Sequence, residues 1–228
     1  MTMTTYRPRA VLFDLDGTLI DSIPDIQEAL NDALAERDID PFDRASVRVM
    51  VGGGTGILLE RALLRRGVSI EDTERDRLVS RFLEFYEPRA SRLTTLLPGA
   101  PEALAACRRR GMKVGLVTNK PAAPSRSILE AFGLLADFDL IVGGDAGPAK
   151  KPNPDLLLHA AERLDLSAGS CLFVGDSEND VEAARGADMP VAAVENGYTQ
   201  LSMDEMAPTY RLASLHDLDA LLEALPQV

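Results

Sequence analysis

The chain of 228 residues has only two histidines, two cysteines and no tryptophan. Cys107 and Cys171 do not form a metal-binding spacing, and we expect both to be reduced, one in a helix and one in a strand. His159 and His216 each fall in a helix-like pattern. This scarcity argues against histidine-based catalysis and against a histidine zinc site.

Long apolar runs and an excess of basic residues are also missing. The sequence contains no run of about 18 apolar residues, and residues 1–9 lack the apolar core of a signal peptide, so we expect a cytoplasmic protein. The formal net charge of −12 argues against nucleic acid and anionic membranes as partners. An anionic small substrate would therefore need a local cation within its site.

Short apolar runs alternate with helical patterns over most of the chain, which is typical of a parallel sheet with crossover helices. We expect strands at 10–14, 114–118, 139–142, 171–175 and 191–194. Helical patterns lie between them near 99–110, 122–132, 153–164 and 178–187, and a last helix follows Ser214. Asn153 is the expected N-cap of the third of these, with Pro154 at its first position. The pattern predicts an α/β fold.

Residues 22–91 interrupt this alternation. They contain no convincing strand and favour consecutive helices near 23–37, 43–50, 55–66 and 71–90, the last with an amphipathic stripe. We interpret 22–91 as an inserted helical domain and 1–21 with 92–228 as the α/β core. Such an insertion would lie above the carboxyl ends of the strands, over Asp14 and Asp16.

The most informative stretch is Val-Leu-Phe-Asp-Leu-Asp-Gly-Thr-Leu, residues 11–19. It places two carboxylates, Asp14 and Asp16, at the end of an apolar strand, where ionised groups are costly to bury without a partner. In open α/β sheets this end of the strands borders the ligand-binding crevice. Taken alone, Asp16 followed by glycine is also an ordinary turn.

Three further segments place polar groups at the same edge of the predicted sheet. Thr118 and Asn119 follow the second strand, Lys150-Lys151-Pro152 precedes a helix, and Gly175-Asp176 with Asp180 follows another strand. Each has a plain structural alternative. Thr118-Asn119 would serve as a strand end and helix cap, Lys151 as a solvated charge, and Asp180 as part of a capping box with Ser177.

The clustered carboxylates require a cation. Two carboxylates about 4 Å apart repel by roughly 4 kcal/mol at an effective dielectric constant near 20. Oxygen ligands without histidine or cysteine favour Mg²⁺, which is commonly bound by a few carboxylates, water and substrate phosphate oxygens. A lysine beside that metal would attract a dianionic substrate.

These motifs together resemble the haloacid dehalogenase superfamily over nearly the whole chain. The resemblance rests on Asp-x-Asp-Gly-Thr at 14–18, Thr118, Lys151-Pro152 and the Gly-Asp-x-x-x-Asp run at 175–180. It implies a Rossmann-like three-layer core with a parallel sheet, and a four-helix cap formed by 22–91. Thr118-Asn119-Lys120-Pro121, Gly143-Gly144-Asp145 and Val51-Gly52-Gly53-Gly54 are similar to the phosphoglycolate phosphatases of that superfamily.

The resemblance also implies roles for individual residues. Asp14 would attack phosphorus to form an aspartyl-phosphate, and Asp16 would act as general acid and then general base. Thr118, Asn119 and Lys151 would bind the phosphoryl group, with Lys150 as a competitor for the lysine role. The implied Mg²⁺ site consists of Asp14, the backbone carbonyl of Asp16, Asp176 and, through water, Asp180.

Substrate selection would belong to the inserted helices. Gly53 and Gly54 lie in the glycine-rich segment 52–56, which is either a ligand-facing loop or an interhelical turn. Arg48, Arg61 and Arg65 are candidates to hold a substrate carboxylate. The expected function is hydrolysis of a small phosphomonoester, 2-phosphoglycolate first. The alternatives are a larger sugar or amino-sugar phosphate, a phosphomutase, or a non-catalytic phospho-ligand binding protein. A dehalogenase is disfavoured because Asp16 supplies an acid/base carboxylate that dehalogenation does not need.

Overall fold

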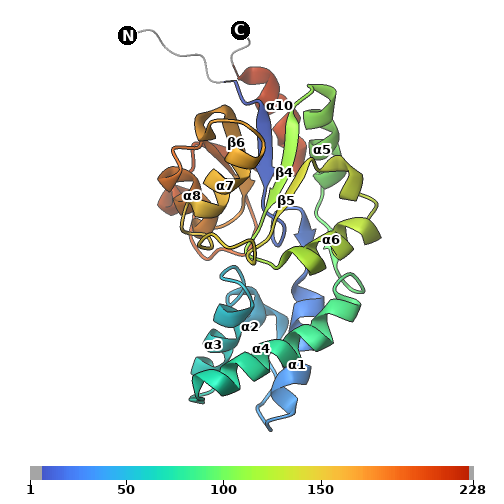
Figure 1. Ribbon diagram of the computed structural model, residues 1–228, viewed down its shortest axis with the longest axis vertical. Helices are drawn as coiled ribbons and strands as arrows, with labels where there is room; N and C mark the ends of the chain where they lie inside the picture. The colour runs from blue at the N-terminus through green and yellow to red at the C-terminus, as the bar shows by residue number, and fades with distance from the viewer. Residues whose placement is uncertain (1–6, 226–228) are drawn as a thin grey trace.

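The computed structural model describes residues 7–225, and its centre is a six-stranded parallel sheet (Figure 1). The strands lie in the order β5-β4-β1-β6-β7-β8, and each adjacent pair is parallel. Their bounds are β1 Ala10–Phe13, β4 Lys113–Val117, β5 Leu140–Val142, β6 Cys171–Gly175, β7 Val191–Val194 and β8 Tyr210–Leu212. The predicted α/β fold with a parallel sheet is confirmed.

Helices cover both faces of the sheet, because alternate residues of β1 belong to different apolar clusters. Val11 and Phe13 pack with α5 (Ala100–Arg109), α6 (Ala122–Ala131) and α10 (Leu218–Ala224). Ala10 and Leu12 pack on the other face with α7 (Asp155–Arg163) and α8 (Glu178–Gly186). The result is the three-layer arrangement expected for this class. Cys107 lies buried in α5 and Cys171 in β6, as expected.

The chain from residue 23 to 86 forms a helical bundle of α1 (Ile23–Ala35), α2 (Arg44–Arg48), α3 (Thr55–Arg65) and α4 (Asp72–Tyr86). Figure 1 shows this helical bundle grouped at one end of the molecule, beyond the edge of the sheet. Helix α1 has Pro24 in its first turn and buries Ile26, Leu30 and Leu34 at helical spacing. Its buried face packs mainly on α4.

Two short strands join the helical bundle to the rest of the chain. Strand β2 (Ile20–Asp21) pairs antiparallel with β3 (Thr95–Leu96), so the chain enters and leaves the bundle at one place. Just inside, Asp25 of α1 is fully buried and accepts hydrogen bonds from the backbone N–H of Leu93 and of Thr94 at 2.9 and 2.7 Å.

The structure corrects several predicted boundaries. The helix expected at 43–50 ends at Arg48, and that expected at 71–90 is α4 followed by a 3₁₀ turn, Glu87–Arg89. Helix α7 begins at Asp155, so Pro154 rather than Asn153 is its N-cap, although the Asn153 side chain accepts from the Asp155 N–H at 3.0 Å.

The remaining elements are α9 (Met203–Met206) and 3₁₀ turns at Leu135–Asp137, Ala168–Ser170 and Leu215–Asp217. In the described part of the chain, every helix is too short or too polar to cross a membrane.

Candidate active site

Asp14 immediately follows β1 at the edge of the sheet that faces the helical bundle. Its backbone N–H donates to the carbonyl of Val174 at 2.9 Å, which extends the sheet pairing by one residue and fixes the direction of the carboxylate. Gly17 then turns the chain with a φ of +89°, and a Cβ there would lie 2.4 Å from the Asp176 Oδ2. Glycine at this turn therefore lets the second carboxylate approach the first.

Asp176 follows β6, the strand beside β1, and is almost completely buried. Its Oδ1 accepts from the Thr18 hydroxyl at 2.8 Å and its Oδ2 from the Tyr198 N–H at 2.6 Å. Burial, with Asp180 and Asp14 nearby, nevertheless raises the pKa of Asp176 well above its usual value. Its negative charge is thus poorly compensated by the protein alone.

Asp180, in the first turn of α8, uses its two oxygens differently. The Oδ2 accepts from the Asp176 N–H at 3.0 Å and from the Ser177 N–H and hydroxyl at 3.1 and 2.8 Å, which is the capping box. The Oδ1 accepts from the Lys151 ammonium at 2.7 Å. Asp180 therefore caps the helix and faces the other site carboxylates at the same time.

Lys151 and Lys150 have very different positions. The Lys151 side chain is 2% exposed, and its Nζ lies 2.8 Å from the Asp14 Oδ1 as well as donating to the Val117 carbonyl at 3.1 Å. Lys150 is exposed. The buried ammonium of Lys151 is thus the cation in direct contact with Asp14.

Three carboxylates lie close together here, and the Lys151 ammonium contacts two of them, Asp14 and Asp180. Asp14, Asp176 and Asp180 each offer an oxygen within 4.8 Å of the others. Burial, opposed by Lys151, raises the pKa of Asp14 to about 6. Three acidic side chains against one lysine leave an excess of negative charge in a buried place, and hard oxygen donors suit a divalent cation. The described residues therefore fit a divalent metal.

Asp16 points to a different partner that the sequence analysis did not identify. Both of its carboxylate oxygens accept from the Lys120 Nζ at 3.0 Å, and its Oδ1 also accepts from the Ser22 hydroxyl at 2.5 Å. Lys120 directly follows Thr118-Asn119 and precedes a proline. That position, just beyond the end of β4 at the same edge, is the signal that could have revealed it.

Thr118 and Asn119 also lie at this edge, but they use their polar groups differently. Thr118 is buried beside Asp14, and its hydroxyl accepts from the Lys120 N–H at 3.3 Å. The Asn119 amide donates at 2.8 Å to the carbonyls of Gly52 and Lys151. Asn119 therefore links the helical bundle to the lysine segment, and it also lines the cavity described next.

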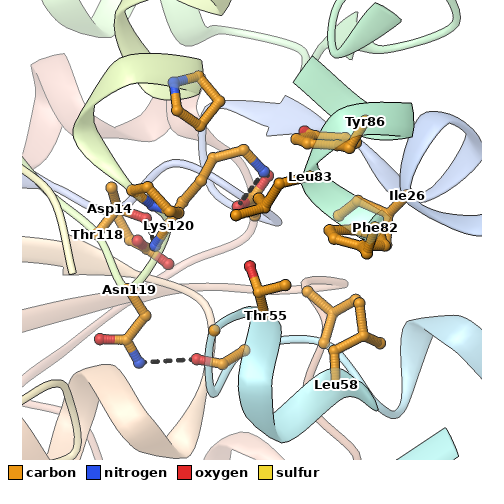
Figure 2. A pocket seen from close by; sticks show the side chains of 16 residues that line it. Asp14, Ile26, Thr55, Leu58, Phe82, Leu83, Tyr86, Thr118, Asn119 and Lys120 are labelled. Atoms are coloured by element: carbon orange, nitrogen blue, oxygen red, sulfur yellow. Dashed lines mark hydrogen bonds and ion pairs between the residues drawn. The ribbon is translucent and has the colours of Figure 1, made fainter. Parts of the chain in front are cut away.

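A small cavity of about 60 Å³ lies between the helical bundle and the sheet edge (Figure 2). Its floor includes Asp14, Asp16, Thr118 and Lys120. The helical bundle contributes mostly apolar walls; the residues that line them are Ile26, Val51, Leu58, Phe82, Leu83 and Tyr86. Asp14, Asp16 and residues of the helical bundle therefore line the same cavity.

The three arginines expected to bind a substrate carboxylate do not line this cavity. Arg48 donates to the carbonyls of Asn196 and Gly197 at 2.5 Å, Arg61 donates to the Met50 carbonyl at 3.0 Å, and Arg65 is exposed. Of the glycines, Gly54 lines the cavity, whereas a Cβ on Gly53 would lie 2.7 Å from the Ile57 side chain. Arg48 therefore braces the helical bundle against the loop beside Asp176.

Comparison with known proteins identifies the family. The model of the family described as haloacid dehalogenase-like hydrolase matches residues 8–188. The chain belongs to this family. The match spans Asp14, Thr118, Lys151 and Asp180, so the four segments that meet in the structure lie inside the family region.

Individual relatives extend this result over almost the whole chain. A phosphoglycolate phosphatase of Rhodospirillum rubrum is 40% identical over 217 residues, covering 92% of this chain and 90% of its own. The structure of a predicted phosphoglycolate phosphatase from Haemophilus somnus superposes with a TM-score of 0.88 at 28% identity, covering 96% and 99% of the two chains. A variant of CbbY from Rhodobacter sphaeroides, in complex with xylulose-1,5-bisphosphate, gives 0.80 at 25%, covering 92% and 96%.

Proposed function

We propose that this haloacid dehalogenase-like hydrolase is a Mg²⁺-dependent phosphomonoesterase that works through an aspartyl-phosphate. One observation carries the proposal: Asp14 contacts a buried ammonium and lies close to two further carboxylates, with a second pair, Asp16 and Lys120, lining the same cavity. A nucleophile beside cations, with an acid/base group two residues away, is the equipment that phosphoryl transfer to water requires.

Each residue has a role that follows from its position. The Asp14 carboxylate attacks phosphorus, while Lys151 holds that carboxylate and neutralises phosphoryl oxygens. Thr118, buried beside Asp14, offers a hydroxyl to the same oxygens. Asp16 protonates the leaving alkoxide and then deprotonates the water that hydrolyses the intermediate. Asp14, Asp176 and Asp180, with the Asp16 carbonyl, would hold Mg²⁺, which supplies charge neutralisation at the phosphoryl group when bound.

The proposed substrate is 2-phosphoglycolate. Two observations support it: the similarity of the chain to the phosphoglycolate phosphatase of Rhodospirillum rubrum, and the small size of the cavity beneath the helical bundle. We assign 22–91 as a cap domain and 1–21 with 92–228 as the core, so that the cap closes over Asp14 and excludes water. The xylulose-1,5-bisphosphate bound to the CbbY variant favours a larger sugar phosphate as the second candidate.

Phosphate release with Mg²⁺ across a substrate panel tests the proposal. The panel contains 2-phosphoglycolate, glycerol phosphates, hexose phosphates, an amino-sugar 6-phosphate and a nucleoside monophosphate. We expect kcat/KM for 2-phosphoglycolate to exceed the others by about 100-fold or more, which corresponds to roughly 3 kcal/mol of selective binding. A sugar phosphate as the best substrate would replace the substrate assignment and leave the chemistry intact.

The same assay applied to Asp14→Asn tests the nucleophile. The variant should fold like the wild type, because Asn has the same shape, and should lose turnover by several orders of magnitude (about 10³-fold or more) because no aspartyl-phosphate can form. Turnover close to the wild-type rate would contradict the mechanism. Transfer of phosphate to a sugar hydroxyl in place of water would indicate a mutase.

A further inference from the structure

We propose that Lys120 and Tyr86 form the seat for the substrate's carboxylate, and so determine selectivity for a phosphoester that carries a second anionic group. This inference rests on the proposed phosphatase function and goes beyond it by assigning the residues that recognise the part of the substrate remote from phosphorus. It replaces the arginines that the sequence favoured, which the structure places elsewhere.

The charge distribution of the cavity leads to Lys120. Among the described residues that line the cavity, Lys120 is the only basic one, and its side chain is 7% exposed. The walls contributed by α1, α3 and α4 are largely apolar. A carboxylate entering this space loses much of its hydration, so it needs a charged partner, and only Lys120 is available on the lining.

The ammonium of Lys120 has capacity for a second carboxylate. An ammonium has three donors, and the two 3.0 Å contacts to the Asp16 oxygens occupy two of them. Burial opposes the charge on Lys120, but Asp16 and its other neighbours raise its pKa above the ordinary value, so the side chain stays cationic. It can therefore hold Asp16 and a substrate carboxylate together.

Tyr86 supplies the second donor. Its side chain is 2% exposed; the Lys120 ammonium acts on its hydroxyl oxygen, but among the described residues no acceptor receives the hydroxyl proton. A buried hydroxyl whose proton has no acceptor carries a desolvation cost that a ligand acceptor would remove. The Lys120 Nζ lies 4.6 Å from the centre of the Tyr86 ring, and Figure 2 shows the hydroxyl end of Tyr86 directed toward that ammonium.

The two residues come from different parts of the molecule. Lys120 follows β4 in the sheet body, whereas Tyr86 ends α4 of the helical bundle, where it stacks on Phe82 with ring centres 5.5 Å apart. A carboxylate held by both would bridge the bundle and the sheet edge. A substrate that lacks the carboxylate would leave the buried Tyr86 hydroxyl proton without an acceptor, which disfavours binding of that substrate.

A pair of matched substrates tests the seat directly. The first is 2-phosphoglycolate, and the second is 2-hydroxyethyl phosphate, in which a neutral hydroxymethyl group replaces the carboxylate. Lys120→Met should lower the ratio of their kcat/KM values by about 100-fold, because a desolvated charge pair is lost. Tyr86→Phe, which keeps the stack on Phe82, should lower it by roughly 5–10-fold for the loss of one hydrogen bond. Lys113→Met, at an exposed lysine, is the control and should leave the ratio unchanged.

An equal loss for both substrates in Lys120→Met would overturn the proposal, since Lys120 would then act only through Asp16. A loss of selectivity in Thr55→Val, with none in Lys120→Met or Tyr86→Phe, would also overturn it and move recognition to the first turn of α3.

If the wild type hydrolyses neither substrate, the proposed phosphatase function is wrong, and substrate binding then tests the carboxylate seat. Asp14→Asn with Mg²⁺ should then bind 2-phosphoglycolate more tightly than 2-hydroxyethyl phosphate, and adding Lys120→Met should abolish that difference. Equal affinities would overturn the seat.

Discussion

At the scale of single residues, the site depends on how one ammonium is shared. Lys151 is in contact with both Asp14 and Asp180 at 2.8 and 2.7 Å, and all three side chains are largely or fully buried. A buried ion pair adds little stability when it is formed, but removal of one partner leaves a charge unpaired and costs several kcal/mol. Lys151 is therefore required both for the position of Asp14 and for the charge balance around it.

Substitution of the two adjacent lysines separates these roles from a general effect of positive charge. Lys151→Ala should lower kcat by at least about 10²–10³-fold, because the phosphoryl group and Asp14 lose a fixed cation. Lys150→Ala should change kcat by no more than about twofold, as expected for an exposed side chain. Steady-state kinetics on 2-phosphoglycolate makes the comparison, and a larger loss for Lys150→Ala would transfer the role to that residue.

The sequence singled out some site residues and missed others for a clear reason. Asp14, Asp16 and Asp176 stand out because carboxylates at the ends of apolar runs conflict with burial. Lys120 carries no such conflict, and its partner Asp16 lies more than a hundred positions away, so only the fold brings them together. Tyr86 fits the amphipathic stripe of α4, and its polar end has no sequence signature.

At the scale of secondary-structure elements, the attachment of the helical bundle to the α/β core depends on the two chain segments that connect them. The β2–β3 pair contributes only two residues from each strand. Asp25 adds to it: besides the backbone groups of Leu93 and Thr94, its Oδ2 accepts from the Thr94 hydroxyl at 2.8 Å. One buried carboxylate at the start of α1 thus satisfies three donors on the returning chain.

Removal of that carboxylate should destabilise the protein through the connection. Asp25→Ala leaves the backbone N–H groups of Leu93 and Thr94 without their acceptor, whereas the Thr94 hydroxyl keeps the Ala90 carbonyl at 3.0 Å, and we expect a loss of about 2–4 kcal/mol in the free energy of unfolding. Urea denaturation followed by circular dichroism measures it. Asp76→Ala, at an exposed position of α4, is the matched control and should change stability by less than about 0.5 kcal/mol. Equal stability of the two variants would show that Asp25 does not fix the connection.

The elements that the sequence did not predict are short. Strands β2 and β3 have two residues each, and β8 has three at the edge of the sheet. Segments this short do not show a recognisable alternation of apolar and polar residues in the sequence. Of the five strands that were expected, β1, β4, β6 and β7 are mainly apolar, have four or five residues and are almost entirely buried. Strand β5 is as short as β8, but all three of its residues are apolar, whereas β8 contains Arg211. The helices of the bundle were predicted from their apolar spacing, whereas their ends were set by local capping, as at Asp43, whose side chain accepts from the Ser46 N–H.

At the scale of the whole molecule, an acidic protein holds a site for an anion by local arrangement. The chain has a formal net charge of −12, yet two buried ammonium groups, Lys120 and Lys151, lie beside the site carboxylates. The general field of the protein disfavours anions, and buried pairs at short range outweigh it because salt and water screen distant charges. The divalent metal would complete this local balance, so its removal should be detectable in the stability of the entire fold.

The pH dependence of stability without metal follows from the raised carboxyl pKa values. Burial raises the pKa of Asp14 to about 6 in the folded chain, against 3.8 for the ordinary side chain, and the pKa of Asp176 is raised as well. Between these values the folded state binds more protons than the unfolded state, so stability decreases as pH rises. From pH 5 to 7.5, Asp14 alone should lower the unfolding free energy of EDTA-treated protein by about 1–2 kcal/mol.

Addition of Mg²⁺ at pH 7.5 should reverse that loss and restore phosphatase activity, because binding to the folded state alone stabilises it. Urea denaturation of the metal-free and Mg²⁺-loaded protein at both pH values provides the comparison. Asp176→Asn is the matched variant: it removes one of the repelling carboxylates, so its metal-free form should show a smaller decrease between pH 5 and 7.5. A metal-free wild type that becomes more stable over this interval, or activity that survives EDTA, would contradict a carboxylate cluster built around a divalent cation.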